Sequence, residues 1–424
     1  MSTTAEVATG IRPFKVEIPQ EQLDVLRRRI NAARLPSKEL VGDRSQGVQL
    51  ATIQELARYW ATDYDWRKAE AKLNALPQFT TEIDGVDIHF IHVRSPHDDA
   101  LPLLMTHGWP GSVIELLETI EPLTDPAAHG GSADDAFHLV LPSLPGYGYS
   151  GEPSELGWYT GRTAQAWAEL MHRLGYMRYV AQGGDQGAAV TDDLAHLGPE
   201  GLIGVHLNLL RRALGSTDGL PAQSEQERAA LEAVGTFRSS GFGYFLEQST
   251  RPQTIGYSLL DSPVGLAGWM LDHDTDSYYK IAHAFVDGQP VGNLTRDHVL
   301  DNITLYWLTG TGASSARSYW EGGQAAARAA GQTPKPVTSR SPSQRSQARS
   351  SARRAAGPRP STPPSSTSTR PARGATSQPG RSLSSSRPSY GPRSRPFAKE
   401  ESWQFMKQCS RRPGSGAPIC KSTI

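Results

Sequence analysis

The sequence predicts an α/β fold with a doubly wound, largely parallel β-sheet. Short apolar runs that end in turn signals occur at residues 101–108 (LPLLMTHG), 137–146 (FHLVLPSLPG) and 176–187 (YMRYVAQGGDQG), which is typical of buried parallel strands. Helical patterns lie between these runs at residues 112–123 and 162–175. The fold class rests on this alternation of strands and helices.

Two further elements are predicted ahead of these strands. Residues 18–36 place apolar side chains at helical spacing before a proline that would stop the helix: Leu23, Leu26, Ile30, Ala33 and Pro36. This spacing predicts an amphipathic opening helix. Residues 87–93 (DIHFIHV) alternate as a strand does, and we count them with the buried parallel strands.

The pattern changes in the second half of the chain. Between about residues 210 and 300 it is irregular and aromatic, with SSGFGYFLEQST and DSPVGLAGWMLDHDTDSYYK as recognisable pieces, which predicts a lid inserted between strands. A helical pattern from Leu300 to Glu321 then returns the chain to the main domain. From Gly331 to about Pro396 small and polar residues prevail without apolar periodicity, so we predict a disordered tail.

These observations predict five parts for the chain of 424 residues. They are an N-terminal extension (1–95), the first part of the core (96–210), the lid (211–299), a return to the core (300–330) and the disordered tail (331–424).

Composition excludes several classes of protein. No apolar run approaches the roughly 20 residues that span a bilayer, and the N-terminus has no hydrophobic signal core, so we expect a soluble, cytoplasmic protein without a membrane partner. Cys409 and Cys420 lie near the C-terminus, which leaves the folded part without a disulfide framework or a cysteine metal site.

The net charge of zero hides an asymmetry, because the chain up to Glu321 has 24 basic and 41 acidic residues and the rest has 19 basic and 2 acidic residues. This indicates an appended basic arm or two sequences of different origin.

The motif that carries chemistry is GGDQG, Gly183 to Gly187, which follows an apolar strand and precedes a helix. It has the G-x-nucleophile-x-G form of a nucleophile elbow, with Asp185 in the position where esterases have serine. A side chain at either flanking glycine would clash with the neighbouring strand or helix. The alternative is that Asp185 is simply an N-cap at the start of the helix.

An aspartate nucleophile narrows the reaction. Attack on an acyl carbon would give an unstable anhydride, whereas attack on a saturated carbon gives an ester that water can cleave. Epoxides and alkyl halides are therefore the plausible substrates, and an epoxide needs an acid because it leaves as an alkoxide.

A second motif, HGWPGS at residues 107–112, follows an earlier strand and would reach the same edge of the sheet. An oxyanion hole belongs there, and we assign it to the backbone N–H groups of Trp109 and Gln186. The alternative is a structural turn in which local hydrogen bonds satisfy His107.

Together these motifs resemble the microsomal-type epoxide hydrolase family, which includes juvenile hormone epoxide hydrolases. The resemblance covers IRPFKVEIP, YDWRKAEAKLNALPQF, HGWPGS, LPGYGYSGEP, GGDQG, DSPVGL and YWLTGTGASS, and it extends to about Glu321. It implies an α/β-hydrolase fold with an N-terminal extension and a lid, and the hydrolysis of an epoxide to a vicinal diol without a metal or cofactor.

The resemblance also implies site residues. Asp185 matches the aspartate nucleophile, and Tyr244 and Tyr319 match the two lid tyrosines that protonate the epoxide oxygen. Gln186 stands where haloalkane dehalogenases typically carry tryptophan, and a tyrosine pair suits an alkoxide, so the epoxide is preferred over the halide. Detoxification and aromatic hydrocarbon catabolism are the implied roles.

The family also implies a histidine in a GGHF motif near the C-terminus, with an acidic partner before it. This chain has neither, because its last histidine is His298 and we expect His172 and His206 to be surface residues. A shifted reading frame can restore both: a glutamate would straddle Ala348 and Arg349, and a GGHF histidine would straddle Ala375 and Thr376. We therefore infer a frameshift between about residues 333 and 341, against a genuine basic tail.

Two functions follow. The gene encodes an epoxide hydrolase that uses an epoxide and water, and whose turnover is impaired in this chain. Alternatively, the chain is a hydrolase-like protein that does not turn over and whose basic arm binds nonspecifically; no specific nucleic acid is expected. A homodimer stays open.

Overall fold

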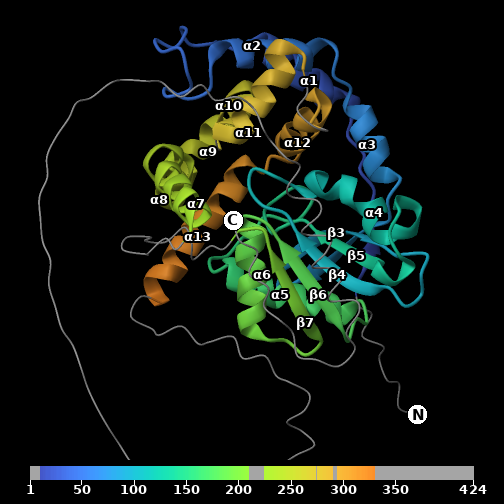
Figure 1. The fold of residues 1–424 in the computed structure, drawn as a ribbon. Helices are drawn as coiled ribbons and strands as arrows, with labels where there is room; N and C mark the ends of the chain where they lie inside the picture. Colours follow the sequence, from blue (N-terminus) through green and yellow to red (C-terminus); the bar gives the residue numbers. More distant parts are fainter. Residues whose placement is uncertain (1–9, 210–223, 274, 290–293, 330–424) are drawn as a thin grey trace, which may run out of the picture.

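The chain is described from a computed structural model over residues 10–209, 224–273, 275–289 and 294–329. The tail predicted at residues 331–424 lies outside these ranges. Within them, a central sheet forms the lower layer in Figure 1 and a layer of helices covers one of its ends. The lower layer contains the sheet and its flanking helices, and the upper layer joins helices from both the N-terminal segment and the second half of the chain.

In the described part of the chain, the central sheet has seven strands in the order β1-β2-β3-β5-β4-β6-β7. Their bounds are Arg12–Pro13 (β1), Gln78–Ile83 (β2), Val86–Val93 (β3), Leu101–Thr106 (β4), Phe137–Pro142 (β5), Tyr179–Gly183 (β6) and Leu202–Leu207 (β7). Strands β5, β4, β6 and β7 are parallel, which confirms the predicted parallel runs. The prediction for residues 87–93 is wrong in orientation, because β3 pairs antiparallel with both β2 and β5.

Helices on the sheet follow the predicted alternation. The crossovers contain η1 (Val113–Thr119), α4 (Ile120–Thr124), η2 (Pro126–His129), η3 (Ala133–Asp135), α5 (Thr160–Arg173) and α6 (Gln186–Leu197). The helix predicted at residues 112–123 is a 3-10 helix that passes into a short α-helix. Both views place α5 next to α6, and Figure 1 shows α6 beside β6 and β7, with α4 on the other side of the strands.

The second half of the chain after β7 is helical in the described ranges, and most of its helices lie in the upper layer, while α13 runs down towards the sheet. The helices of this half, with their bounds, are α7 (Glu225–Thr236), η5 (Phe237–Gly241), α8 (Gly243–Thr250), α9 (Pro252–Asp261), α10 (Pro263–Leu271), α11 (Thr275–Ala282), η6 (His283–Asp287), α12 (Arg296–Thr309) and α13 (Gly312–Ala329). The helix expected from Leu300 to Glu321 is divided, because Gly310 adopts a left-handed conformation (φ 67°) that ends α12.

The N-terminal helices join this upper layer, although they are far from it in sequence. They are α1 (Gln20–Asn31), α2 (Leu50–Thr62) and α3 (Trp66–Asn74), and both views place α1 and α2 next to α10. The opening helix buries Leu23, Leu26 and Ile30 as predicted. It ends at Asn31, so Ala33 lies outside it and Pro36 does not stop it directly.

Hydrogen bonds fix the N-terminal segment to α12. The indole Nε1 of Trp60 donates to Thr304 Oγ1 at 2.9 Å, and the hydroxyl of Tyr64 donates to Asp301 Oδ1 at 2.8 Å. All four side chains are buried, and burial raises the pKa of Asp301 to about 6.

None of the helices in the described ranges combines the length and apolar character of a membrane span.

We predict that Asp301 makes stability depend on pH. Its raised pKa means that the folded protein holds a proton which the unfolded chain releases, so its contribution is present below about pH 4 and is lost as the pH rises through 6. The free energy of unfolding, compared with Asp301→Asn, should therefore fall by up to about 3 kcal/mol from pH 4 to pH 7. Urea denaturation of both proteins across this range measures the difference. A difference that does not change with pH would contradict the assignment.

Candidate active site

The turn between β6 and α6 has the strained geometry predicted from GGDQG. Asp185 adopts φ 49° and ψ −117°, a backbone conformation that residues other than glycine rarely adopt. Besides Asp185, only Asp84 among the described non-glycine residues has a positive φ. A strained residue at the end of a buried parallel strand is what the nucleophile elbow requires.

The flanking glycines are needed because the chain crosses itself closely. A Cβ atom on Gly183 would lie 2.1 Å from the carbonyl oxygen of Gly187, and one on Gly187 would lie 2.0 Å from that of Thr106. The clash predicted from the sequence is therefore confirmed. Gly184 differs, since its Cβ would meet nothing nearer than the side chain of Asn208 at 3.8 Å.

The HGWPGS turn reaches Asp185 from the neighbouring strand. Strands β4 and β6 are parallel and adjacent, so their carboxyl ends meet at one edge of the sheet. There the backbone N–H of Trp109 donates to Asp185 Oδ1 at 3.0 Å. A Cβ on Gly108 would lie 2.5 Å from Asp185 Cβ, so only glycine allows this approach. Gln186 is the first residue of α6, where backbone N–H groups have no partner within the helix.

Aromatic side chains enclose the same region. The Trp109 ring stacks on Tyr244 with centroids 4.9 Å apart and meets the edge of Tyr319 at 6.1 Å. The two tyrosine rings are themselves 6.1 Å apart, and only 6% of Tyr244 and 4% of Tyr319 is exposed. Tyr244 comes from α8 and Tyr319 from α13, so both tyrosines that the sequence singled out lie against the turn that contacts Asp185.

The surroundings keep Tyr319 protonated. Burial, followed by the nearby charge of Asp185, raises the pKa of Tyr319 well above its ordinary value. The Gln186 side chain lies close to the Tyr319 hydroxyl and acts in the opposite direction on this pKa, but the hydroxyl forms no hydrogen bond of regular geometry among the described residues. A buried phenol that holds its proton and has an open donor can serve as a hydrogen-bond donor to a substrate oxygen.

His107 is held by local hydrogen bonds, as the structural alternative proposed. Its ring nitrogens lie 3.0 Å from the Gly108 carbonyl oxygen and 3.1 Å from the Leu144 amide nitrogen. Burial lowers the pKa of His107 to about 4, so the ring is neutral. Its two hydrogen bonds join the turn to Leu144, while Trp109 contacts Asp185.

The other histidines differ from one another. His172 on α5 is exposed, as expected, but the expected surface position of His206 is wrong, because this residue is buried in β7. His273 was not predicted as a site residue, yet its ring lies 5.1 Å from that of Tyr244 and 6.0 Å from that of Trp109. Its only signal was its place just after DSPVGLAGWMLD in the predicted lid.

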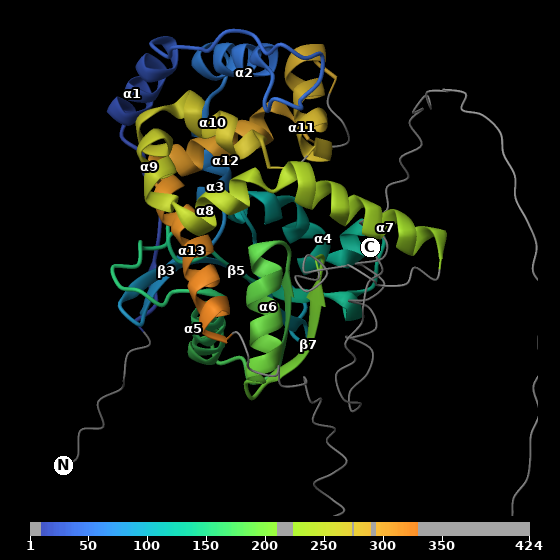
Figure 2. The same ribbon diagram turned by 90° about the vertical axis from the view of Figure 1, so that its left-hand side faces the viewer.

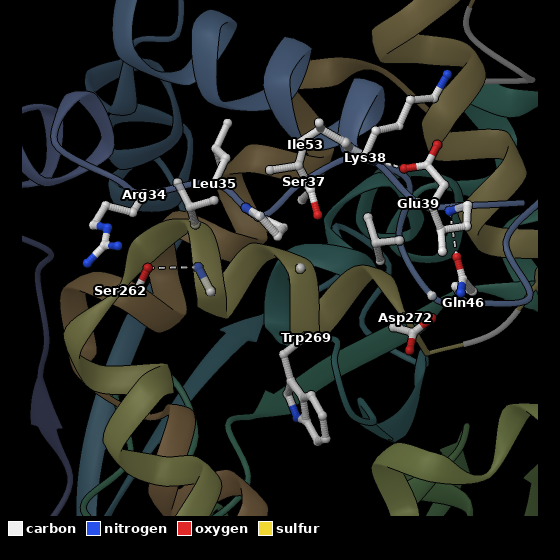
Figure 3. A pocket seen from close by; sticks show the side chains of 18 residues that line it. Arg34, Leu35, Ser37, Lys38, Glu39, Gln46, Ile53, Ser262, Trp269 and Asp272 are labelled. Atoms are coloured by element: carbon white, nitrogen blue, oxygen red, sulfur yellow. Dashed lines mark hydrogen bonds between the residues drawn. The ribbon is translucent and has the colours of Figure 1, made fainter.

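A hollow of about 680 Å³ lies apart from this group, between residues 34–50 and α10. Its lining includes Lys38, Glu39 and Asp272, and Figure 3 shows the indole of Trp269 directed away from the labelled side chains of the 34–50 segment. Asp185, Tyr244 and Tyr319 are not among the lining residues. Within the described ranges, no group of three or more His, Cys, Asp or Glu side chains is placed to hold a metal ion.

Comparisons with known proteins agree with this geometry. Residues 11–116 match the family model "Epoxide hydrolase N terminus". A protein of Stigmatella aurantiaca (strain DW4/3-1) assigned as an epoxide hydrolase is 55% identical over 317 residues, which are 74% of this chain and 69% of that protein. Epoxide hydrolase 1 of Oryctolagus cuniculus is 37% identical over 336 residues, 74% of this chain and 72% of that protein.

Solved structures give the same result. The epoxide hydrolase of Aspergillus niger matches with a TM-score of 0.63 and 32% identity over 74% of this chain and 79% of that one. The juvenile hormone epoxide hydrolase of the silkworm Bombyx mori matches with a TM-score of 0.61 and 31% identity over 74% and 76% of the two chains.

The elbow generates a test with a control inside the same motif. Gly183→Ala and Gly187→Ala should each lower the free energy of unfolding by about 3 kcal/mol, because the new methyl group meets backbone atoms that have little room to move. Gly184→Ala should change it by less than about 1 kcal/mol. Chemical denaturation of the three variants measures these values. Equal losses at all three positions would mean that the close crossing is absent.

Proposed function

Because the chain belongs to the epoxide hydrolase family and has its α/β-hydrolase fold, we propose that Asp185 is the nucleophile that opens an epoxide ring. The observation that carries this proposal is the place of Asp185: it sits in a strained turn, its Oδ1 accepts from the N–H of Trp109, and two buried tyrosines lie against Trp109. Membership of this family makes the chain a hydrolase by descent.

In the first step, Asp185 attacks a ring carbon of the epoxide. A carboxylate oxygen forms a bond to that carbon while the carbon–oxygen bond of the ring breaks, which gives an alkyl ester and an alkoxide. Tyr244 and Tyr319 donate hydrogen bonds to the leaving oxygen, and one phenol transfers its proton to it. The hydrogen bond from the backbone N–H of Trp109 holds the Asp185 carboxylate in the attacking position.

In the second step, water cleaves the ester and a vicinal diol is released. The water oxygen stays on the Asp185 carboxylate, one of its protons goes to the departing alcohol oxygen and the other restores the phenol. The backbone N–H groups of Trp109 and Gln186 stabilise the oxyanion that forms on the ester. This step needs a base to activate the water, and we propose that the base and its acidic partner belong to the shifted reading frame beyond about residue 333. In the chain as written, the second step is therefore impaired.

Two alternative functions are compared with this proposal. A haloalkane-type hydrolase would use the same nucleophile, but a halide gains less than an alkoxide from a pair of tyrosines. A hydrolase-like protein with a basic arm would need no aligned nucleophile, so the strained and costly conformation of Asp185 favours the enzyme. The proposal also includes a cytoplasmic location and a homodimer. The proposed roles are detoxification and aromatic hydrocarbon catabolism.

We predict that the chain takes up one alkyl group and then stops. Incubation with styrene oxide should add a single adduct to the peptide that contains Asp185, because ring opening uses only residues in the described part of the chain. Intact-protein mass spectrometry and peptide mapping give the number and place of adducts. Asp185→Asn is the control and should take up none. Continuous release of diol by the unmodified chain would contradict this, and His273→Phe would then test whether His273 supplies the base.

The tyrosines should act on ring opening rather than on folding. Tyr319→Phe should slow the formation of the adduct at saturating epoxide by about 100-fold, since the donor to the leaving oxygen is lost. Tyr244→Phe should slow it to a similar extent. Tyr257→Phe is the matched control, because Tyr257 is 70% exposed on α9, and it should leave the rate unchanged. A rate that does not change in either buried variant would remove the tyrosines from the mechanism.

A further inference from the structure

We propose that Glu115 is a positioning residue for ring opening, which acts by holding the HGWPGS turn so that the N–H of Trp109 meets Asp185. This inference rests on the proposed nucleophile and adds a residue that does not itself contact the substrate. Glu115 lies in η1, one turn of chain after the motif, and its side chain folds back onto the motif.

The Glu115 carboxyl occupies the inner side of the turn. Its Oε1 accepts from the backbone N–H of Gly108 at 3.2 Å. A Cβ on Gly111 would lie 1.7 Å from Oε2, so the carboxyl fills the space that a side chain at residue 111 would need. Consecutive N–H groups thus have different acceptors, with Gly108 directed to Glu115 and Trp109 directed to Asp185.

Helix α12 holds the other side of the same turn. The Asn302 amide Nδ2 donates to the Pro110 carbonyl oxygen at 2.6 Å, and the Tyr306 hydroxyl donates to the Gly111 carbonyl oxygen at 2.7 Å. These bonds fix the carbonyl groups, whereas Glu115 is the acceptor for the amide that precedes Trp109. Glu115 therefore supplies a constraint that α12 does not duplicate.

The charge of Glu115 is compatible with a nearby nucleophile. Loss of solvation around the carboxyl group, followed by the charge of Asp185, raises the pKa of Glu115 above its ordinary value. Glu115 is nevertheless an exposed residue by its accessible surface, so the contacts of its carboxyl group rather than its protonation state carry the argument. A protonated carboxyl resembles a glutamine amide in shape and keeps a carbonyl oxygen that can accept from Gly108.

The test compares two substitutions at Glu115 with one at Glu118, which lies three residues later and does not contact the HGWPGS turn in the described hydrogen bonds. Glu115→Ala should slow adduct formation at Asp185 at saturating styrene oxide by about 10-fold to 100-fold, because a small displacement of the attacking group is costly. The concentration of epoxide that gives half the maximal rate should change by less than about 3-fold, since positioning acts on the reacting geometry rather than on binding. Glu115→Gln should restore the rate to within about 3-fold of the original. Glu118→Gln, which alters an exposed pair with Lys72, should have no effect.

A second readout does not depend on the reaction. Hydrogen–deuterium exchange of the peptide that spans residues 106–112 should be faster in Glu115→Ala than in the original chain or in Glu115→Gln, because the Gly108 N–H loses its acceptor. If the alanine variant does not fold, Glu115→Met keeps the bulk without the oxygen acceptor and takes its place.

Three results would overturn the inference. They are an alanine variant with the original rate, a loss that is confined to binding, and a glutamine variant as slow as the alanine variant. If the original chain gains no adduct at Asp185, the proposed nucleophile fails instead, and unchanged exchange in the alanine variant would then still overturn the role of Glu115.

Discussion

The rest of the candidate site depends on the hydrogen bond from the Trp109 N–H to the Asp185 carboxylate. It joins two turns that leave adjacent parallel strands at the same edge of the sheet, so it exists only if β4 and β6 keep their register. It also requires glycine at residue 108, because any side chain there would collide with Asp185. The aromatic rings of the upper layer then pack on Trp109 itself. One contact therefore connects the sheet, the elbow and the tyrosines.

Local chemistry explains why much of this was predictable from the sequence. The GGDQG motif alone predicts the elbow, since a close strand-to-helix crossing needs glycine at both flanks and a nucleophile elbow has a polar residue between them. Apolar runs of strand length identified β4, β5 and β6. The tyrosines came from a resemblance rather than from a pattern, because a single tyrosine in an irregular segment gives no signal of its own.

The remaining features depend on pairing and packing between distant segments. The alternating pattern of residues 87–93 is the same for a parallel and an antiparallel strand. The orientation of β3 becomes known only from its pairing with β2. His206 looked like a surface residue, but it lies in the buried middle of β7, which no motif marked. Glu115 and His273 lie near motifs without being part of them, and their positions follow from how η1 and α10 pack.

The two halves of the proposed reaction are distributed unequally along the chain. Every group assigned to ring opening lies in the described part, whereas we propose that the base for ester hydrolysis is encoded in a shifted reading frame beyond about residue 333. The most direct measurement is to restore that frame in the coding DNA and count the diol molecules released per chain from styrene oxide. The account predicts many for the restored chain and no more than one for the chain as written; equal turnover by both would contradict it.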